Sequence, residues 1–359
     1  MNILILTGRF GMGHCSAAEA LRQEILLKDP EAKVDVVDII DYMLPSFSNL
    51  LYGTFNFMVS KCSKIYNFLY EQSAKYCRAP FKRTFIKKVD SLLNTFEPKL
   101  IISTLPICSQ YISAYKSMKF CSIPLHTYIT DIKAHEEWIA KNTDMYFVGS
   151  RSTKNTLISK GIPGEKIVIS GIPVKPVFRE KNICKNLGGT KEVLIIGGGL
   201  GLIPSSEMLL KRLSKNKSLH ITIITGKNKK LFLKIKKEFP EMEVMGYTSK
   251  VDEYMKKADI VITKSGGITT FEAINCETPL YIIRPFLSQE WGNAEYIENL
   301  NIGRVLWSEN TDVAEDILSL IENKNLLNEM QENMRKIKSH LYPVVPLLFC
   351  GNRGEELCF

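Results

Sequence analysis

The chain has 359 residues, of which 45% are hydrophobic and 24% are charged, and this balance excludes a disordered or fibrous protein. Its length fits two domains, and 47 Lys and Arg against 38 Asp and Glu leave a net charge of +9. If that excess is clustered, it indicates nucleic acid, an anionic membrane or a phosphorylated ligand as a partner.

The cysteines and the apolar runs exclude further classes. The nine cysteines are scattered and never spaced C-x-x-C, so we expect neither a zinc site nor a disulfide framework, and a reducing cytoplasm is the simplest setting. No apolar stretch reaches about 18 residues, and the first apolar run is short and lacks a basic leader. We therefore expect neither a membrane-spanning helix nor a signal peptide.

The first forty residues predict a βαβ unit. Asn2 to Thr7 is an apolar strand, a glycine-rich turn follows, Ala17 to Leu27 has helical spacing, and Val34 to Ile40 is a second strand. Such a unit implies a parallel sheet with ligand contacts at the carboxyl ends of its strands. His14 stands at the helix start, where the dipole disfavours imidazolium, so it is either a neutral general base or a structural histidine.

Residues 44–90 interrupt the α/β alternation. They hold eight Lys and Arg against two acidic residues, together with ten of the chain's 34 aromatics. Basic and aromatic residues mixed on helices are typical of a segment that binds an anionic membrane surface, and a packed helical insertion with a solvated basic face explains them equally well. No nucleic-acid module is present, so we expect no nucleic-acid partner.

Further strands predicted over Lys99–Ser103, Leu125–Ile129 and Met145–Val148 complete the first half. After the second of these, Asp131 and His135 follow in the block TDIKAHEEW, either at a cleft edge or as satisfied loop residues. The pattern then restarts with strand Glu192–Ile196 and a glycine loop, followed by strands His220–Thr225, Glu243–Met245 and Asp259–Thr263. The predicted fold class is α/β, with two Rossmann-like domains facing each other across a cleft.

The strongest local signal lies at residues 263–272, TKSGGITTFE, where a buried strand runs through a Gly-Gly turn into a helix. Free backbone N–H groups and the positive end of the dipole make this helix start an anion site, most naturally for a diphosphate. Glu272, within the helix, can accept hydrogen bonds from paired hydroxyls such as those of a ribose. The stretch PFLSQEWGN after strand Pro279–Ile283 offers Gln289, Glu290 and Asn293 in a polar loop at the same sheet edge.

Taken together, these blocks resemble a known family. The opening ILILTGRFGMGHCSAAEAL, the block TDIKAHEEW, the linker SGIPVKPVF, the loop GGGLG and the long stretch from GYTSKVDEY to SQEWGNAEY look like the monogalactosyldiacylglycerol synthases and the processive diacylglycerol β-glucosyltransferases. The resemblance covers about residues 1–330 in order. It implies the two-domain GT-B fold of glycosyltransferase family 28 and a monotopic membrane enzyme on the cytoplasmic face of the cell membrane.

The resemblance also implies a reaction, in which a hexose, glucose or galactose, moves from a UDP-sugar to diacylglycerol with inversion and without a catalytic metal or other cofactor. The catalytic set would be His14 as the base, with Asp131 and His135 near the acceptor. Donor-binding residues would be Gly13, Gly199, Gly201, Gly246, Tyr247, Ser265, Gly266, Gly267, Ile268, Thr269, Glu272, Gln289, Glu290 and Asn293. The basic residues expected to bind the anionic membrane surface are Lys82, Arg83, Lys87 and Lys88.

Two other functions stay open, namely transfer of N-acetylglucosamine to a lipid-linked peptidoglycan precursor and non-catalytic sensing of a UDP-sugar. The predicted domains are residues 1–175 for the acceptor and membrane, with 44–90 as their insertion, and residues 176–335 for the donor. Residues 336–359 form an atypical tail, because Leu341 to Phe359 lacks the long helix that returns to the first domain in relatives. Arg9 and Phe10 also depart from the family pattern, at the acceptor side.

Overall fold

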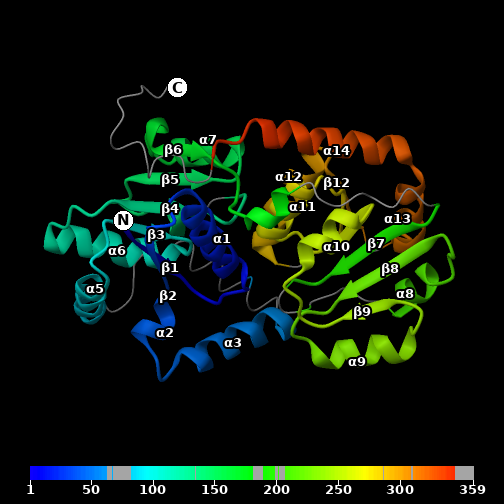
Figure 1. Cartoon of the computed structure of the whole chain (residues 1–359), viewed down its shortest axis with the longest axis horizontal. Coiled ribbons are helices and arrows are strands. Elements are labelled where there is room, and N and C mark those ends of the chain that lie inside the picture. Colours follow the sequence, from blue (N-terminus) through cyan, green and yellow to red (C-terminus); the bar gives the residue numbers. More distant parts are fainter. Residues whose placement is uncertain are drawn as a thin grey trace.

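The computed structural model describes residues 1–62, 67, 82–133, 135–180, 189–198, 201, 207–285, 287–308 and 310–343, with the backbone alone at residues 60, 61, 82–84, 288 and 289. Two parallel sheets lie in two halves of the molecule, side by side in Figure 1. The first sheet has the order β2-β1-β3-β4-β5-β6 and the second the order β12-β11-β10-β7-β8-β9. The predicted fold class, two Rossmann-like halves, is confirmed.

The elements of the first half alternate as the βαβ pattern predicts. They are β1 (Asn2–Thr7), α1 (Gly13–Lys28), β2 (Lys33–Asp38), α2 (Ile39–Met43), α3 (Ser48–Lys61), α5 (Lys82–Phe96), β3 (Leu100–Ser103), α6 (Pro106–Lys119), β4 (Leu125–Tyr128), η1 (Glu136–Trp138), β5 (Met145–Val148), α7 (Arg151–Ser159), η2 (Gly164–Lys166), β6 (Ile167–Ile169) and η3 (Pro176–Arg179).

The second half repeats the alternation. Its elements are β7 (Lys191–Ile196), α8 (Glu207–Leu213), β8 (Leu219–Ile224), α9 (Lys229–Glu238), β9 (Glu243–Met245), α10 (Val251–Lys257), β10 (Ile260–Thr263), α11 (Gly267–Cys276), β11 (Leu280–Ile282), α12 (Ser288–Asn299), β12 (Gly303–Val305), α13 (Val313–Glu322) and α14 (Lys324–Ser339). No helix within these described ranges is both long and apolar enough to cross a bilayer.

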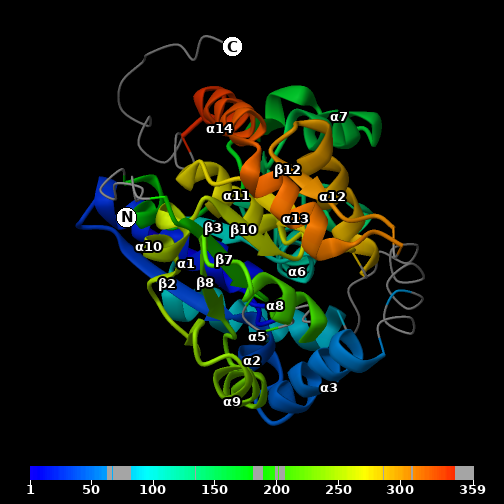
Figure 2. The same ribbon diagram turned by 90° about the vertical axis from the view of Figure 1, so that its right-hand side faces the viewer.

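Each sheet is covered on both faces because successive side chains of a strand point to opposite sides. In β1, Ile3 and Ile5 pack with α1, while Leu4 and Leu6 pack against residues of α5 and α6. In β7, Leu194 packs toward α11, α12 and α14, and the opposite face of the sheet packs against α8, α9 and α13. Figure 2 shows the second sheet enclosed between these helices.

The order of the strands fixes where a ligand can bind. In each sheet the chain adds its first strands on one side and its later strands on the other. The change of side falls between β1 and β3 in the first half and between β7 and β10 in the second. Loops at the carboxyl ends of the strands separate at such a switch point and leave a crevice. The glycine-rich turns predicted from the sequence follow β1, β7 and β10, so all three lie at the two crevices.

The chain after α14 touches the first half. The helix runs along the second half with its red end near α7 of the first half in Figure 1, and the Tyr342 N–H then donates to the carbonyl of Ile169 at 3.0 Å. The prediction that Leu341 to Phe359 lacks a long returning helix stays a prediction, because only residues 341–343 of this stretch are described. The predicted start of the tail at residue 336 lies inside α14, and residues 344–359 lie outside the described residues.

Candidate functional site

The two crevices open into one cavity of about 440 Å³ between the halves of the molecule. The structure brings most of the predicted residues to its walls, although they come from loops more than a hundred residues apart. The predicted residues that line the cavity are Gly13, His14, Asp131, Tyr247, Ser265, Gly266, Gly267, Ile268, Thr269, Glu272, Glu290 and Asn293.

His14 lies on the first turn of α1, and its contacts fix the position of the imidazole proton. Nδ1 lies 2.8 Å from the carbonyl oxygen of Thr104 and 2.9 Å from the hydroxyl of Thr130. A carbonyl oxygen can only accept a hydrogen bond, so Nδ1 carries the proton and Nε2 keeps a free lone pair. Burial lowers the pKa of His14, although Asp131 opposes this effect. The ring is therefore neutral near pH 7 and has a basic nitrogen available.

Asp131 and His135 follow β4 but have different surroundings. An oxygen of the Asp131 carboxylate accepts a hydrogen bond from the indole of Trp138 at 3.1 Å, and the ring centroids of Trp138 and His14 lie 6.1 Å apart. Asp131 is thus held close to His14 on the cavity wall. His135 precedes η1 and is not among the described residues that line the cavity, while burial lowers its pKa.

The start of α11 has the geometry expected of the anion site that the sequence predicts. Gly266 is the N-cap residue and no side chain caps the helix, so the N–H groups of Gly267, Ile268 and Thr269 face a cavity that these residues line. α1 begins directly opposite, since a Cβ on Gly13 would lie 3.5 Å from Ile268. The positive ends of two helix dipoles therefore meet at one point, which strongly favours a bound anion.

Gly267 is glycine because the two halves touch there. A Cβ at this position would lie 2.4 Å from the carbonyl oxygen of Thr130, closer than atoms approach in proteins. The Thr130 hydroxyl is also a neighbour of the His14 ring. This one backbone contact therefore fixes the start of α11 relative to His14.

Glu272 lies one turn further along α11. Burial raises the pKa of its carboxyl to about 7, with Asp252 adding to the shift and Lys175 opposing it. Because the folded pKa lies above the ordinary value of 4.5, the folded protein holds this proton more tightly than the unfolded chain. Stability from this group is thus present at low pH and is lost as the pH rises towards 7.

If the Glu272 carboxylate accepts two ligand hydroxyls, UDP-glucose should bind more tightly as the pH rises from 6 to 8, by up to about tenfold per unit below the pKa. Titration calorimetry measures the affinity, and the diphosphate diester of this ligand does not itself titrate in that range. The Glu272→Gln variant should bind more weakly with no pH dependence, while its melting temperature at pH 8 exceeds that of the wild type. A pH dependence that survives in this variant would refute the assignment.

Glu290 and Asn293 lie on α12, not in the loop that the sequence indicated. Residues 288–299 are helical, and two bonds fix the start of this helix to the loop after β10: the Ser265 hydroxyl donates to the Glu290 carbonyl, and the Asn293 amide donates to the Ser265 carbonyl, each at 2.8 Å. The Asn293 side-chain oxygen accepts from the Ile132 N–H at 3.1 Å. Asn293 thereby joins both halves at the cavity wall.

Lys264 was not predicted from the sequence. Its Nζ lies 2.7 Å from Oε1 of Glu290, whose side chain is only 2% exposed, and Glu290 Oε2 is buried with no hydrogen-bond partner among the described residues. A buried carboxylate oxygen without a donor is unfavourable, so a ligand hydroxyl at this place would stabilise it. The only sign of this role in the sequence is that Lys264 directly precedes Ser265 in the motif TKSGGITTFE.

Four predicted donor residues are not placed on the cavity wall. Gly199 and the side chain of Gln289 lie outside the described residues. Gly201 and Gly246 are described but do not line the cavity. Gly201 has a φ of +62°, and a Cβ there would collide with the Thr225 carbonyl oxygen, so this glycine allows a tight turn. Sequence reasoning also missed Thr104 and Thr130, because their local sequence is that of any residue just after a strand.

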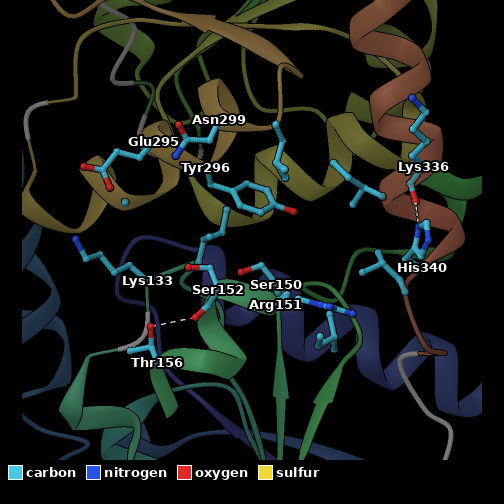
Figure 3. A pocket seen from close by; sticks show the side chains of 17 residues that line it. Lys133, Ser150, Arg151, Ser152, Thr156, Glu295, Tyr296, Asn299, Lys336 and His340 are labelled. Atoms are coloured by element: carbon cyan, nitrogen blue, oxygen red, sulfur yellow. Dashed lines mark hydrogen bonds between the residues drawn. The ribbon is translucent and has the colours of Figure 1, made fainter. Parts of the chain in front are cut away.

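A larger cavity of about 630 Å³ lies between α7, α12 and α14 and contains none of the predicted residues. Figure 3 shows Tyr296 pointing into it, with Lys133 on one side and Lys336 and His340 on the other. The short loop after β4 separates the two spaces, because Asp131 lines the smaller one and Lys133 the larger. The smaller cavity is the candidate site.

Comparisons with known proteins identify the family of this chain. A family model for monogalactosyldiacylglycerol (MGDG) synthase matches residues 14–174, and the model for the glycosyltransferase family 28 C-terminal domain matches residues 193–342. A processive diacylglycerol beta-glucosyltransferase of Bacillus cytotoxicus is 30% identical, over 93% of this chain and 89% of that protein. The chain belongs to this glycosyltransferase family. A protein of the same description from Bacillus cereus is 29% identical over the same shares.

Solved structures share the fold of this family member at low sequence identity. The glycotransferase of kitacinnamycin has a TM-score of 0.65 at 12% identity, covering 94% of this chain and 95% of that one. The Anabaena protein HepE in complex with UDP and glucose has a TM-score of 0.55 at 16% identity, covering 96% of both chains. The chain therefore shares the two-sheet fold of these proteins.

Proposed function

We propose that this protein transfers a hexose from a UDP-sugar to the free hydroxyl of diacylglycerol and forms a β-linked glycolipid. The observation that carries the proposal is the cavity itself, where the lone pair of His14 and the uncapped start of α11 face one space. The relatives named above are described as diacylglycerol glucosyltransferases, which supports the lipid acceptor.

The proposed reaction is a single displacement. Nε2 of His14 takes the proton of the acceptor hydroxyl as its oxygen forms a bond with the anomeric carbon. The bond from that carbon to the β-phosphate oxygen breaks, and its electron pair leaves with UDP. The N–H groups at the start of α11 stabilise the charge on the leaving diphosphate, and one displacement inverts the anomeric configuration. Glu290 and Asn293 would hold the sugar, and Glu272 the ribose.

The proposed site of action is the surface of the cytoplasmic leaflet, where the acceptor lies. α3, at the lower edge of Figures 1 and 2, exposes Phe47, Leu50 and Leu51 to solvent, which supports insertion between headgroups. Lys87 on α5 is exposed and free to meet anionic lipid. Lys88 is half-buried and donates to the Met43 carbonyl, so it also fixes α5 to the end of α2.

The function is tested by incubating the protein with diacylglycerol in vesicles containing anionic lipid and, separately, with UDP-glucose, UDP-galactose or UDP-N-acetylglucosamine. Mass spectrometry of the lipids identifies the sugar and the number added. A hexosyl diacylglycerol is expected from one or both hexose donors. Absence of glycolipid with all three donors would reject the proposal, and tight UDP binding in that case would identify a non-catalytic sensor.

We further propose that the reaction needs no divalent cation, because two helix starts already supply positive potential to the diphosphate. Treatment with excess EDTA should change the initial rate of glycolipid formation by less than about twofold. Adding Mg²⁺ or Mn²⁺ back after dialysis is the control. A rate that collapses with chelator and returns with metal would contradict a metal-free reaction.

The membrane footprint can be tested with Lys88, which contacts Met43, left unchanged; the side chains of Lys82 and Arg83 lie outside the described ones. Replacing Lys82, Arg83 and Lys87 by Gln should weaken binding to anionic vesicles by about tenfold or more, since each cation near such a surface contributes about 1 kcal/mol. Vesicle sedimentation measures the binding, and neutral vesicles are the control. Equal binding of the variant and the wild type to anionic vesicles would assign these charges to solubility alone.

A further inference from the structure

Three apolar side chains that the proposed chemistry does not use also line the cavity. They are Phe10, Phe55 and Val59, and all three come from the first half. Phe55 and Val59 lie one turn apart on α3 and so share one face of this helix, while Phe10 comes from the glycine-rich loop after β1. We call these three residues the apolar wall.

The apolar wall is held in place by a polar network. The Phe10 ring packs against both Tyr52 and Phe55, with ring centroids 4.9 and 5.1 Å away. The Tyr52 hydroxyl accepts from the Arg9 N–H at 3.0 Å and donates to the Asp38 carboxylate at 2.7 Å. This network fixes α3 to the loop that carries the catalytic base.

The Arg9 side chain strengthens the same attachment. Its guanidinium donates to Asp38 at 3.2 Å and to Asp41 at 2.6 Å, and it stacks over the Tyr52 ring at 4.7 Å from the centroid. Arg9 therefore holds Tyr52, and with it the neighbouring Phe10 ring, in place.

The apolar wall and His14 line the same cavity, and Phe10 precedes His14 by four residues in the chain. A substrate whose hydroxyl reaches Nε2 of His14 must place the rest of its body somewhere in that space. Lys264, Glu272 and Glu290 line the part of the cavity assigned to the donor, so the apolar body of an acceptor is favoured against the wall of the first half. α3 also continues outwards into the exposed apolar residues Phe47 and Leu50.

We propose that Phe10, Phe55 and Val59 form an acyl-binding subsite, which holds the carbons nearest the glycerol of one acyl chain of the acceptor. The proposal rests on the proposed function, because it needs a lipid acceptor. The subsite orients the glycerol so that its free hydroxyl meets His14. Acceptors with longer chains are then better substrates even when no membrane is present, because each added methylene removes apolar surface from water.

The test uses 1,2-diacylglycerols with acetyl, butanoyl or hexanoyl chains, dissolved without vesicles, and compares kcat/KM between them. In the wild type, kcat/KM should rise about tenfold or more from acetyl to hexanoyl chains. Phe10→Ala and Phe55→Ala should reduce this rise to less than about threefold, while Phe10→Leu keeps most of it. UDP affinity, measured by calorimetry, should stay the same in all variants and reports on folding.

Phe57→Ala is the matched control, because Phe57 lies two positions further along α3, is exposed and does not line the cavity. Its ratio of kcat/KM between acceptors should equal that of the wild type. An unchanged ratio in both Phe10→Ala and Phe55→Ala, or a wild type that glycosylates vesicle-bound diacylglycerol with no dependence on chain length in solution, overturns the subsite. A wild type that glycosylates no acceptor in either format overturns the proposed function itself.

Discussion

The His14→Ala variant should lose between about 10² and 10⁴ in kcat and bind UDP with nearly the wild-type affinity, because a positioned general base contributes a factor of this size. The imidazole lies on the first turn of α1 with its Nδ1 proton directed at the Thr104 carbonyl, so only Nε2 is left to accept the acceptor's proton. Rates on vesicles and calorimetry with UDP separate the loss of chemistry from the loss of binding.

The pH profile gives this prediction a second readout. Burial lowers the pKa of His14 from its ordinary value of 6.5, so the acid limb of the kcat profile should lie below pH 6.5. The residual kcat of the His14→Ala variant should show no such decrease at acidic pH. Thr130→Val is the matched control, since it removes one neighbour of Nδ1 and leaves the Thr104 carbonyl that fixes the tautomer. A variant without His14 that turns over at the wild-type rate would exclude this residue as the base.

Much of the fold was readable from the sequence because most strands are short apolar runs between polar or turn-forming residues. Strands Asn2–Thr7, Met145–Val148 and Glu243–Met245 were predicted with the bounds that the structure has. β6 (Ile167–Ile169) and β12 (Gly303–Val305) were missed, and each is an edge strand of only three residues. The stretch Pro285–Asn293 was predicted as a loop, although α12 begins at Ser288, because Gly292 and the polar residues around it hide the helical spacing.

The site was readable only in part. Glycine turns after buried strands identify the loops that carry ligand contacts, and this was enough to find His14 and the start of α11. Contacts between residues far apart in the sequence left no local pattern. The pairing of His14 with Thr104 spans 90 residues, and the cation on Glu290 comes from Lys264, 26 residues earlier. Such partners depend on how the loops at the end of each sheet come together, which no local spacing encodes.

The contact between the halves is itself the basis of the second large effect. Gly267→Ala would place a methyl group 2.4 Å from the Thr130 carbonyl oxygen and 2.9 Å from the Ile172 side chain. The first neighbour is backbone, so it cannot rotate away, and the halves must separate or α11 must shift. Both the anion site and the surroundings of His14 would move. Displacements of about 1 Å at reacting groups cost about 10²-fold, so we expect kcat/KM to fall at least that far.

Gly266→Ala is the control that isolates this contact. Gly266 lies one residue earlier on the same turn, and the nearest atom to its added Cβ is the Thr269 hydroxyl at 3.8 Å, an ordinary contact. Its loss of kcat/KM should therefore be much smaller than that of Gly267→Ala, although both changes make the turn stiffer. Melting temperatures of the two variants distinguish a displaced site from a failure to fold. Equal losses in two folded variants would show that stiffness of the turn, and not the contact with Thr130, governs activity.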